Sequence, residues 1–97
     1  MRRRFHPEAE AELNDAVDYY NECQESLGLE FAKEVYAAIE SICEFPLAWT
    51  PLSQNTRRRL LKRFPYGVVY QLKGDEIIII AVMQLNRKPG YWPHRKD

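Results

Sequence analysis

Arginine, lysine and aromatic side chains in the second half of the chain are the residue types best suited to binding or chemistry. Guanidinium groups bind phosphates and carboxylates through paired hydrogen bonds, and aromatic rings stack on nucleobases. RNA, DNA and an acidic peptide are therefore all candidate partners. At least half of these cations are expected only to cover the solvent face of a sheet edge. The candidate binding residues are Arg57, Arg59, Lys62, Lys88, Trp92 and Arg95.

A metal-free ribonuclease is the enzymatic alternative for the same side chains. Cleavage of RNA through its own 2′-hydroxyl needs a base, an acid and a group that stabilises the pentavalent phosphate. Tyrosine, histidine, lysine and arginine fill those roles when positive neighbours shift their pKa values. Lys62 and His94 belong to the wider candidate set. If the chain is a nuclease, its catalytic residues are predicted to be Arg63, Arg87 and Tyr91.

Charge is segregated along the chain, although the formal net charge is zero. Residues 1–56 hold four bases and eleven acids, a net charge of −7, and residues 57–97 hold ten bases and three acids, a net charge of +7. A segregated basic half is typical of a surface that contacts phosphate or an acidic protein. We expect these cations to converge at one margin of a sheet, beside the terminal aromatic residues.

Other site chemistries find little support in the sequence. The two histidines, His6 and His94, lie near opposite ends of the chain and have no second ligand at helical spacing, so no metal site is predicted. Cys23 and Cys43 lie on acidic segments, which do not favour a reactive thiolate, and we expect neither a nucleophile nor a disulfide. The four glycines are not clustered, so no phosphate loop and no cofactor is expected.

Two amphipathic helices are predicted in the acidic half. Pro7 suits the first turn of a helix, and apolar residues recur with helical spacing as far as Leu27. Gly28 is expected to break the helix. A second apolar stripe from Ala32 to Cys43 predicts another helix, which continues to Phe45 and is ended by Pro46. Helices joined so closely must form a hairpin and pack against an apolar partner.

Strands are predicted to provide that partner. A short strand over residues 1–5 is suggested, residues 45–56 resemble a loop anchored by Trp49, and strands are expected over residues 57–64, 68–72 and 77–83. The last strand does not alternate, so it should be central, with helices on one face and little water on the other. The fold class is α+β: an N-terminal strand and a helical hairpin packed on a small antiparallel sheet. Residues 86–97 are expected to be irregular.

The 97 residues leave room for a single domain, residues 1–97. The longest apolar run is far shorter than a membrane span, and no apolar stretch follows the basic start as it would in a signal peptide. We therefore expect a cytoplasmic protein with no membrane partner.

The order of these elements and several short motifs together resemble the RelE/ParE superfamily of type II toxin–antitoxin toxins, often called plasmid stabilisation proteins. The resemblance implies the same α+β fold and covers nearly the whole chain. It rests on Phe5-His6-Pro7 with Ala9 and Leu13, on Phe31, Val35, Ile39 and Ile42 before Pro46, on Arg63-Phe64-Pro65-Tyr66, on Tyr70, and on Arg87-Lys88-Pro89-Gly90-Tyr91-Trp92 with Arg95.

Two branches of that superfamily imply two different targets. One cleaves messenger RNA on the ribosome, and the other poisons DNA gyrase without known catalysis. The tail of this chain is more similar to the ParE branch, although Tyr91 falls on the tyrosine position of the nuclease branch and Arg63 is a basic counterpart. Gln84 stands where many relatives have histidine, and Leu85 where the nuclease branch has an arginine. The ParE-like reading is therefore preferred, with the mRNA endonuclease and a non-toxic binding homologue as alternatives.

A cognate antitoxin is the partner that the resemblance implies. The charge pattern agrees, because an acidic, partly disordered segment could fold across the helices and sheet with its carboxylates on the row from Arg57 to Arg63. The sequence leaves open which antitoxin this is, whether the chain is catalytic, which cellular target it acts on, and its oligomeric state.

Overall fold

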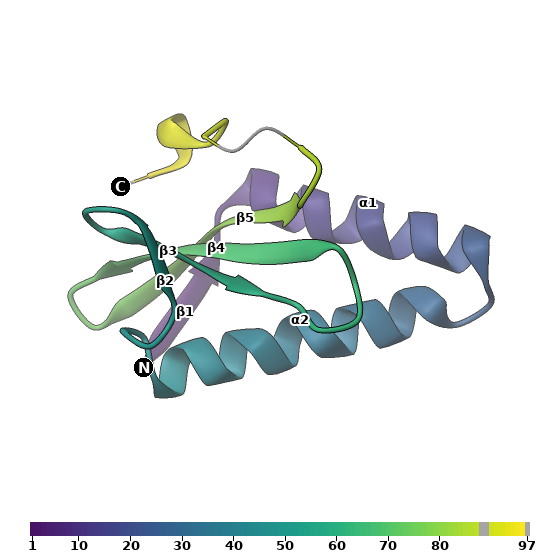
Figure 1. Cartoon of the computed structure of the whole chain (residues 1–97), viewed down its shortest axis with the longest axis horizontal. Coiled ribbons are helices and arrows are strands. Elements are labelled where there is room, and N and C mark those ends of the chain that lie inside the picture. Colours follow the sequence, from purple (N-terminus) through teal and green to yellow (C-terminus); the bar gives the residue numbers. More distant parts are fainter. Residues whose placement is uncertain (88–89, 97) are drawn as a thin grey trace.

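The computed structural model describes residues 1–87 and 90–96 and contains two helices on one face of a five-stranded sheet (Figure 1). The strand β1 spans Arg2–Phe5, and the helices α1 and α2 span Pro7–Cys23 and Leu27–Glu44. The strands β2, β3, β4 and β5 span Thr50–Ser53, Thr56–Leu60, Tyr66–Lys73 and Glu76–Gln84, and a 3₁₀ turn, η1, spans Pro93–Arg95.

The helical hairpin forms where the apolar periodicity predicts it. His6 caps α1 by accepting a hydrogen bond from the Glu8 amide, and Pro7 occupies the first turn. The position of the break differs from the prediction. Residues 24–26 make the turn, with Ser26 in the left-handed conformation, and Gly28 lies inside the first turn of α2. A Cβ on Gly28 would lie 2.3 Å from the Val17 carbonyl oxygen of α1. This glycine therefore allows α2 to pack closely against α1, and it does not end α1.

The sheet order is β1-β5-β4-β3-β2. The neighbours from β5 to β2 are antiparallel, as predicted, whereas β1 runs parallel to β5, so the sheet is mixed. The two strands can be parallel because they are not joined by a tight turn. After β1 the chain passes through the helical hairpin and the strands β2 to β4 before β5 pairs with β1. The α+β class with an N-terminal strand and helical hairpin is confirmed.

Two predictions about strand extent were wrong. The strand expected over residues 57–64 ends at Leu60, because the chain then turns so that Leu61 and Phe64 enter the helical core. Part of the expected loop over residues 45–56 forms the edge strand β2, which pairs with β3. Strand propensity did not indicate β2, because this strand contains Pro51 and proline is tolerated in a strand only at the edge of a sheet.

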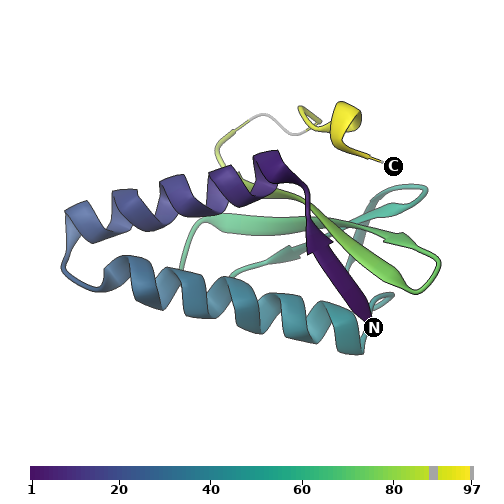
Figure 2. The same ribbon diagram turned by 180° about the vertical axis from the view of Figure 1, so that it is seen from behind.

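Apolar residues are buried on both faces of the sheet. The larger core lies under the helices and includes Phe31, Ile39 and Ile79. The smaller core lies on the opposite face, where Trp92 from the C-terminal tail (residues 85–87 and 90–96) packs against Val69, Ile80, Ala81 and Met83. The tail leaves the end of β5 and turns back along the sheet, as Figures 1 and 2 show. The apolar run of β5 is therefore shielded by helices on one face and by the tail on the other.

Candidate functional site

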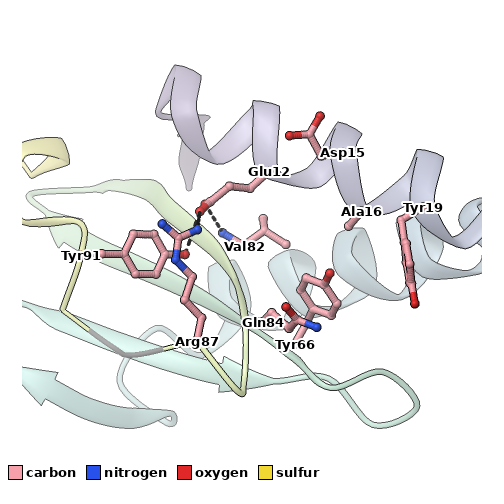
Figure 3. Close-up of a pocket in the computed structure, with 9 residues that line it drawn as sticks. All are labelled: Glu12, Asp15, Ala16, Tyr19, Tyr66, Val82, Gln84, Arg87 and Tyr91. Carbon is pink, nitrogen blue, oxygen red and sulfur yellow. Dashed lines mark hydrogen bonds and ion pairs between the residues drawn. The ribbon is translucent and has the colours of Figure 1, made fainter.

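A cleft of about 210 Å³ opens where α1, the end of β5 and the tail meet (Figure 3). Glu12 and Tyr19 from α1, Tyr66 from β4, and Arg87 and Tyr91 from the tail are among its lining residues. The helix supplies carboxylates, and the tail supplies a guanidinium and a phenol. The cleft therefore joins the acidic and basic halves of the sequence.

Glu12 is the centre of this arrangement. Its side chain is only 16% exposed, and its carboxylate accepts hydrogen bonds from the Val82 amide at 3.0 Å, the Tyr91 hydroxyl at 2.7 Å and the Arg95 guanidinium at 2.9 Å. Arg87 adds an ion pair at 3.7 Å. A partly buried carboxylate is stable only when donors satisfy its oxygens, and here β5 and the tail provide them.

Arg95 is the buried partner of Glu12. Its side chain is 7% exposed and also donates to the Ile80 carbonyl oxygen at 3.0 Å. Glu8, one helical turn before Glu12, lies 3.3 Å from Arg95 Nε and 2.7 Å from His94 Nε2. The His94 contact and the neighbouring positive charges lower the pKa of the Glu8 carboxyl. Arg95 is thus committed to internal contacts and does not present its charge to a partner.

Tyr91 is held as a neutral phenol. Burial, followed by its hydrogen bond to Glu12 and the negative charge of that carboxylate, raises the pKa of Tyr91 well above its ordinary value. The Arg87 guanidinium carbon lies 3.7 Å from the ring centroid, and that of Arg95 lies 5.1 Å away. These cations act against the rise in pKa but do not overcome it. A phenol in this state donates a hydrogen bond and does not accept a proton near neutral pH.

The cations of β3 lie elsewhere and have no acidic partner within the described chain. Arg57 donates to the Leu47 and Trp49 carbonyl oxygens, and Arg59 donates to the Ser41 hydroxyl while its guanidinium carbon lies 3.9 Å from the Trp49 ring centroid. Arg58, on the other face of the strand, has a buried Nε without a hydrogen-bond partner. Alternation along β3 thus divides the three arginines between the two faces of the sheet.

The remaining predicted site residues lie in further places. Arg63 pairs with Glu30 of α2 at 3.0 Å and lines a separate depression with Lys33 and Glu34. Lys62 is exposed, and its backbone amide is bound by Glu34. The side chain of Trp92 is buried. Lys88 lies outside the described residues.

The predicted convergence of cations is therefore only partial. The structure brings together Arg87, Tyr91, Trp92 and Arg95 at the tail, and Arg57 and Arg59 near Trp49, but these are two sites. Glu12 and Glu8 were not identified from the sequence as residues of the tail site. No sequence signal distinguishes them, because the helix carries acids on almost every turn.

Outside these two sites, the part of the chain that the structure describes holds no disulfide and no cluster of metal ligands. Cys23 and Cys43 are both free. Among residues 1–87 and 90–96, no three histidine, cysteine, aspartate or glutamate side chains gather as metal ligands. Over the same residues, no helix has the length and apolar character needed to cross a membrane.

Comparison with known proteins identifies the family. The family model described as the ParE toxin of the type II toxin–antitoxin system parDE matches residues 3–89. A solved structure, described as a chromosomal ParDE TA system from P. aeruginosa, is similar with a TM-score of 0.77 and 18% identity, over 89% of this chain and 97% of that one. At this identity the structural match shows a shared fold. A search of curated protein sequences gave no match. Because the family model spans nearly all of the sequence, the chain belongs to the ParE toxins of type II toxin–antitoxin systems.

Proposed function

We propose that this toxin inhibits growth in the cytoplasm by acting on DNA gyrase, without catalysing a reaction itself, and that a cognate antitoxin neutralises it. The observation that carries the non-catalytic reading is the state of Tyr91. Its hydroxyl donates to Glu12 at 2.7 Å, and its pKa is raised. A general base needs a pKa near the working pH, so this phenol is poorly suited to activating a 2′-hydroxyl.

The positions around the cleft support the same reading. Arg63 and Tyr91, the two residues that match the nuclease branch, line different depressions. Gln84 ends β5 and Leu85 follows it, and neither side chain can take up or release a proton. A nuclease that used Tyr91 with Arg63 would therefore lack both an activated phenol and that basic partner beside it.

The gyrase assignment is tested with purified toxin, gyrase and supercoiled plasmid DNA. We expect cleaved gyrase–DNA complexes to accumulate in proportion to toxin, and toxin premixed with its antitoxin to prevent this. A parallel reaction with translating ribosomes should leave the messages intact. Cuts at codon positions in translated messages, with gyrase unaffected, would establish the ribosome-dependent endonuclease instead. Unimpaired growth after induced expression would identify a non-toxic homologue.

The antitoxin contact is proposed to lie along β2 and β3. The guanidinium groups of Arg57, Arg58 and Arg59 have no carboxylate partner within the described chain, and β2 is an exposed edge strand. An acidic antitoxin segment would supply the missing negative charge, and the edge offers backbone groups for pairing. Ordering that segment has an entropic cost, which the charge pairs and burial offset.

This contact is tested with Arg58→Ala and the matched control Arg2→Ala, whose side chain is 74% exposed on β1 at the opposite edge of the sheet. We expect Arg58→Ala to weaken antitoxin binding about tenfold and to reduce its salt dependence, while Arg2→Ala changes neither. Equal affinity for the two variants would contradict the proposed location. The antitoxin for this assay is to be sought as the product of a small open reading frame beside the toxin gene that encodes a DNA-binding protein.

A further inference from the structure

The edge of β5 is left open beyond the end of β1. The parallel pairing of these strands ends at Phe5 and Ile79, and the chain then turns into α1. A bulge follows at once in β5, since Tyr70 pairs with Ile79 and Val69 pairs with Ala81. Unpaired backbone groups at such an edge need other partners.

Two side chains bind this open edge where a further strand would lie. Glu12 accepts from the Val82 amide, and Arg95 donates to the Ile80 carbonyl oxygen. The two side chains also bind each other at 2.9 Å. This ion pair is therefore fixed to the sheet at both of its ends, which gives the tail a defined position relative to β5.

The same carboxylate also holds the tail at Tyr91, four residues before Arg95. The second oxygen of Glu12 accepts from the Tyr91 hydroxyl, and the Tyr91 ring supports Arg87 at 3.7 Å. The Arg87 side chain is 55% exposed and lines the cleft. Of the tail cations whose contacts are described, Arg95 is buried, whereas Arg87 keeps an exposed guanidinium. The contacts run in order from Glu12 to Tyr91 to Arg87.

We propose that Glu12 is a positioning residue: with Arg95 it clamps the C-terminal tail to the open edge of β5, and through Tyr91 it holds the Arg87 guanidinium in the cleft for an anionic group of the toxin's protein target. This role rests on the proposed function only for the identity of that target. The clamp itself is a property of the isolated chain and is measured without gyrase.

The clamp is tested by hydrogen exchange on the purified full chain. Glu12→Gln keeps the size of the side chain but removes its charge, and Glu10→Gln is the control, because Glu10 is an exposed residue of the same helix. We expect Glu12→Gln to speed exchange of the amides of Arg95 and Lys96 about tenfold more than it speeds exchange of the amides of β4 and β5. Glu10→Gln should leave the tail unchanged. Full tail protection in Glu12→Gln would refute the clamp.

The positioning role is tested by growth inhibition after graded induction of each variant. Glu12→Gln and Arg87→Ala should both reduce inhibition about tenfold, but Arg87→Ala should keep the tail protected, because its ion pair with Glu12 is long. Arg87→Lys, which keeps the charge, should restore part of the inhibition. Undiminished inhibition by Glu12→Gln with a released tail would refute positioning, as would undiminished inhibition by Arg87→Ala.

A second variant covers the case in which Glu12→Gln does not fold. Arg95→Gln breaks the same ion pair from the tail and leaves α1 unaltered, so it should also release the tail and reduce inhibition. Failure of wild-type toxin to affect gyrase, combined with tail release in these variants, would overturn the gyrase assignment and leave the clamp intact. A gyrase-active toxin whose tail stays protected in both variants would overturn the clamp alone.

Discussion

The hydrogen bond from Tyr91 to Glu12 should make a measurable contribution to stability. Tyr91→Phe removes only the hydroxyl and keeps the ring beneath Arg87. The bond is 2.7 Å long and its acceptor is charged, and such bonds contribute roughly 1.5–3 kcal/mol. Glu12 keeps its other donors, so the carboxylate is not left unsatisfied. We therefore expect a loss near the lower limit, about 1–2 kcal/mol in the free energy of unfolding.

The assay is thermal and urea unfolding of the purified chain at neutral pH. For a domain of this size, 1 kcal/mol corresponds to roughly 4–8 °C in Tm. Tyr36→Phe is the matched control, because Tyr36 is 50% exposed and its hydroxyl has no hydrogen bond within the described chain. It should change Tm by less than about 2 °C. Equal Tm values for Tyr91→Phe and wild type would refute the assigned bond.

The pH dependence of the same pair has a definite sign. The pKa of Tyr91 is raised in the folded state, so the folded chain retains this proton while the unfolded phenol ionises near pH 10. The contribution is complete below that pH and is lost as pH rises above it. Tyr20, Tyr66 and Tyr70 have pKa values raised mainly by burial and act in the same direction. Tyr91→Phe should therefore flatten the alkaline loss of stability without abolishing it. An unchanged alkaline slope would contradict this reasoning.

Two further substitutions, each with a comparison variant, probe the helical hairpin and the tail. Gly28→Ala should cost about 2–4 kcal/mol in urea unfolding, since its Cβ would meet the Val17 carbonyl at 2.3 Å, whereas Gly74→Ala, with φ of +61° and open space, should cost only about 1 kcal/mol. Equal losses of stability for the two variants would show that α2 can move away from α1 at little cost, which would contradict the close approach assigned to Gly28. Trp92→Ala should speed tail exchange but lower the global free energy of unfolding by less than the roughly 2–5 kcal/mol expected for Ile79→Ala, because the tail can detach alone. A larger global loss for Trp92→Ala would mean that the tail unfolds only with the whole domain.

Much of the architecture was predictable from short-range patterns. The apolar stripes identified both helices, the β-branched run identified β5, and the motif order indicated the family. Periodicity succeeds here because an amphipathic element records in its own residues which side is buried. Periodicity missed β2 and the end of β3. The strand β2 is defined by its pairing with β3, and β3 ends early because Leu61 and Phe64 are buried in the core; local propensity records neither effect.

The site was less predictable. The sequence identified Arg87, Tyr91, Trp92 and Arg95 as a tail cluster, but it could not separate the buried anchors from the exposed cation. Trp92 and Arg95 are buried, whereas Arg87 remains half exposed. The β3 arginines were expected beside this cluster and instead lie near Trp49 or on the opposite face of their strand.

The amino-acid sequence alone determined the class of fold, the segregation of charge and the residue types of the tail, because each depends on composition and spacing within one segment. The tertiary structure decided which carboxylate matters. Glu12 is one of eleven acids in the first 56 residues, and it differs from the others through donors up to 83 positions away. Burial and hydrogen bonding between distant segments arise only when the chain has folded, and they convert one glutamate of an acidic helix into the anchor of the tail.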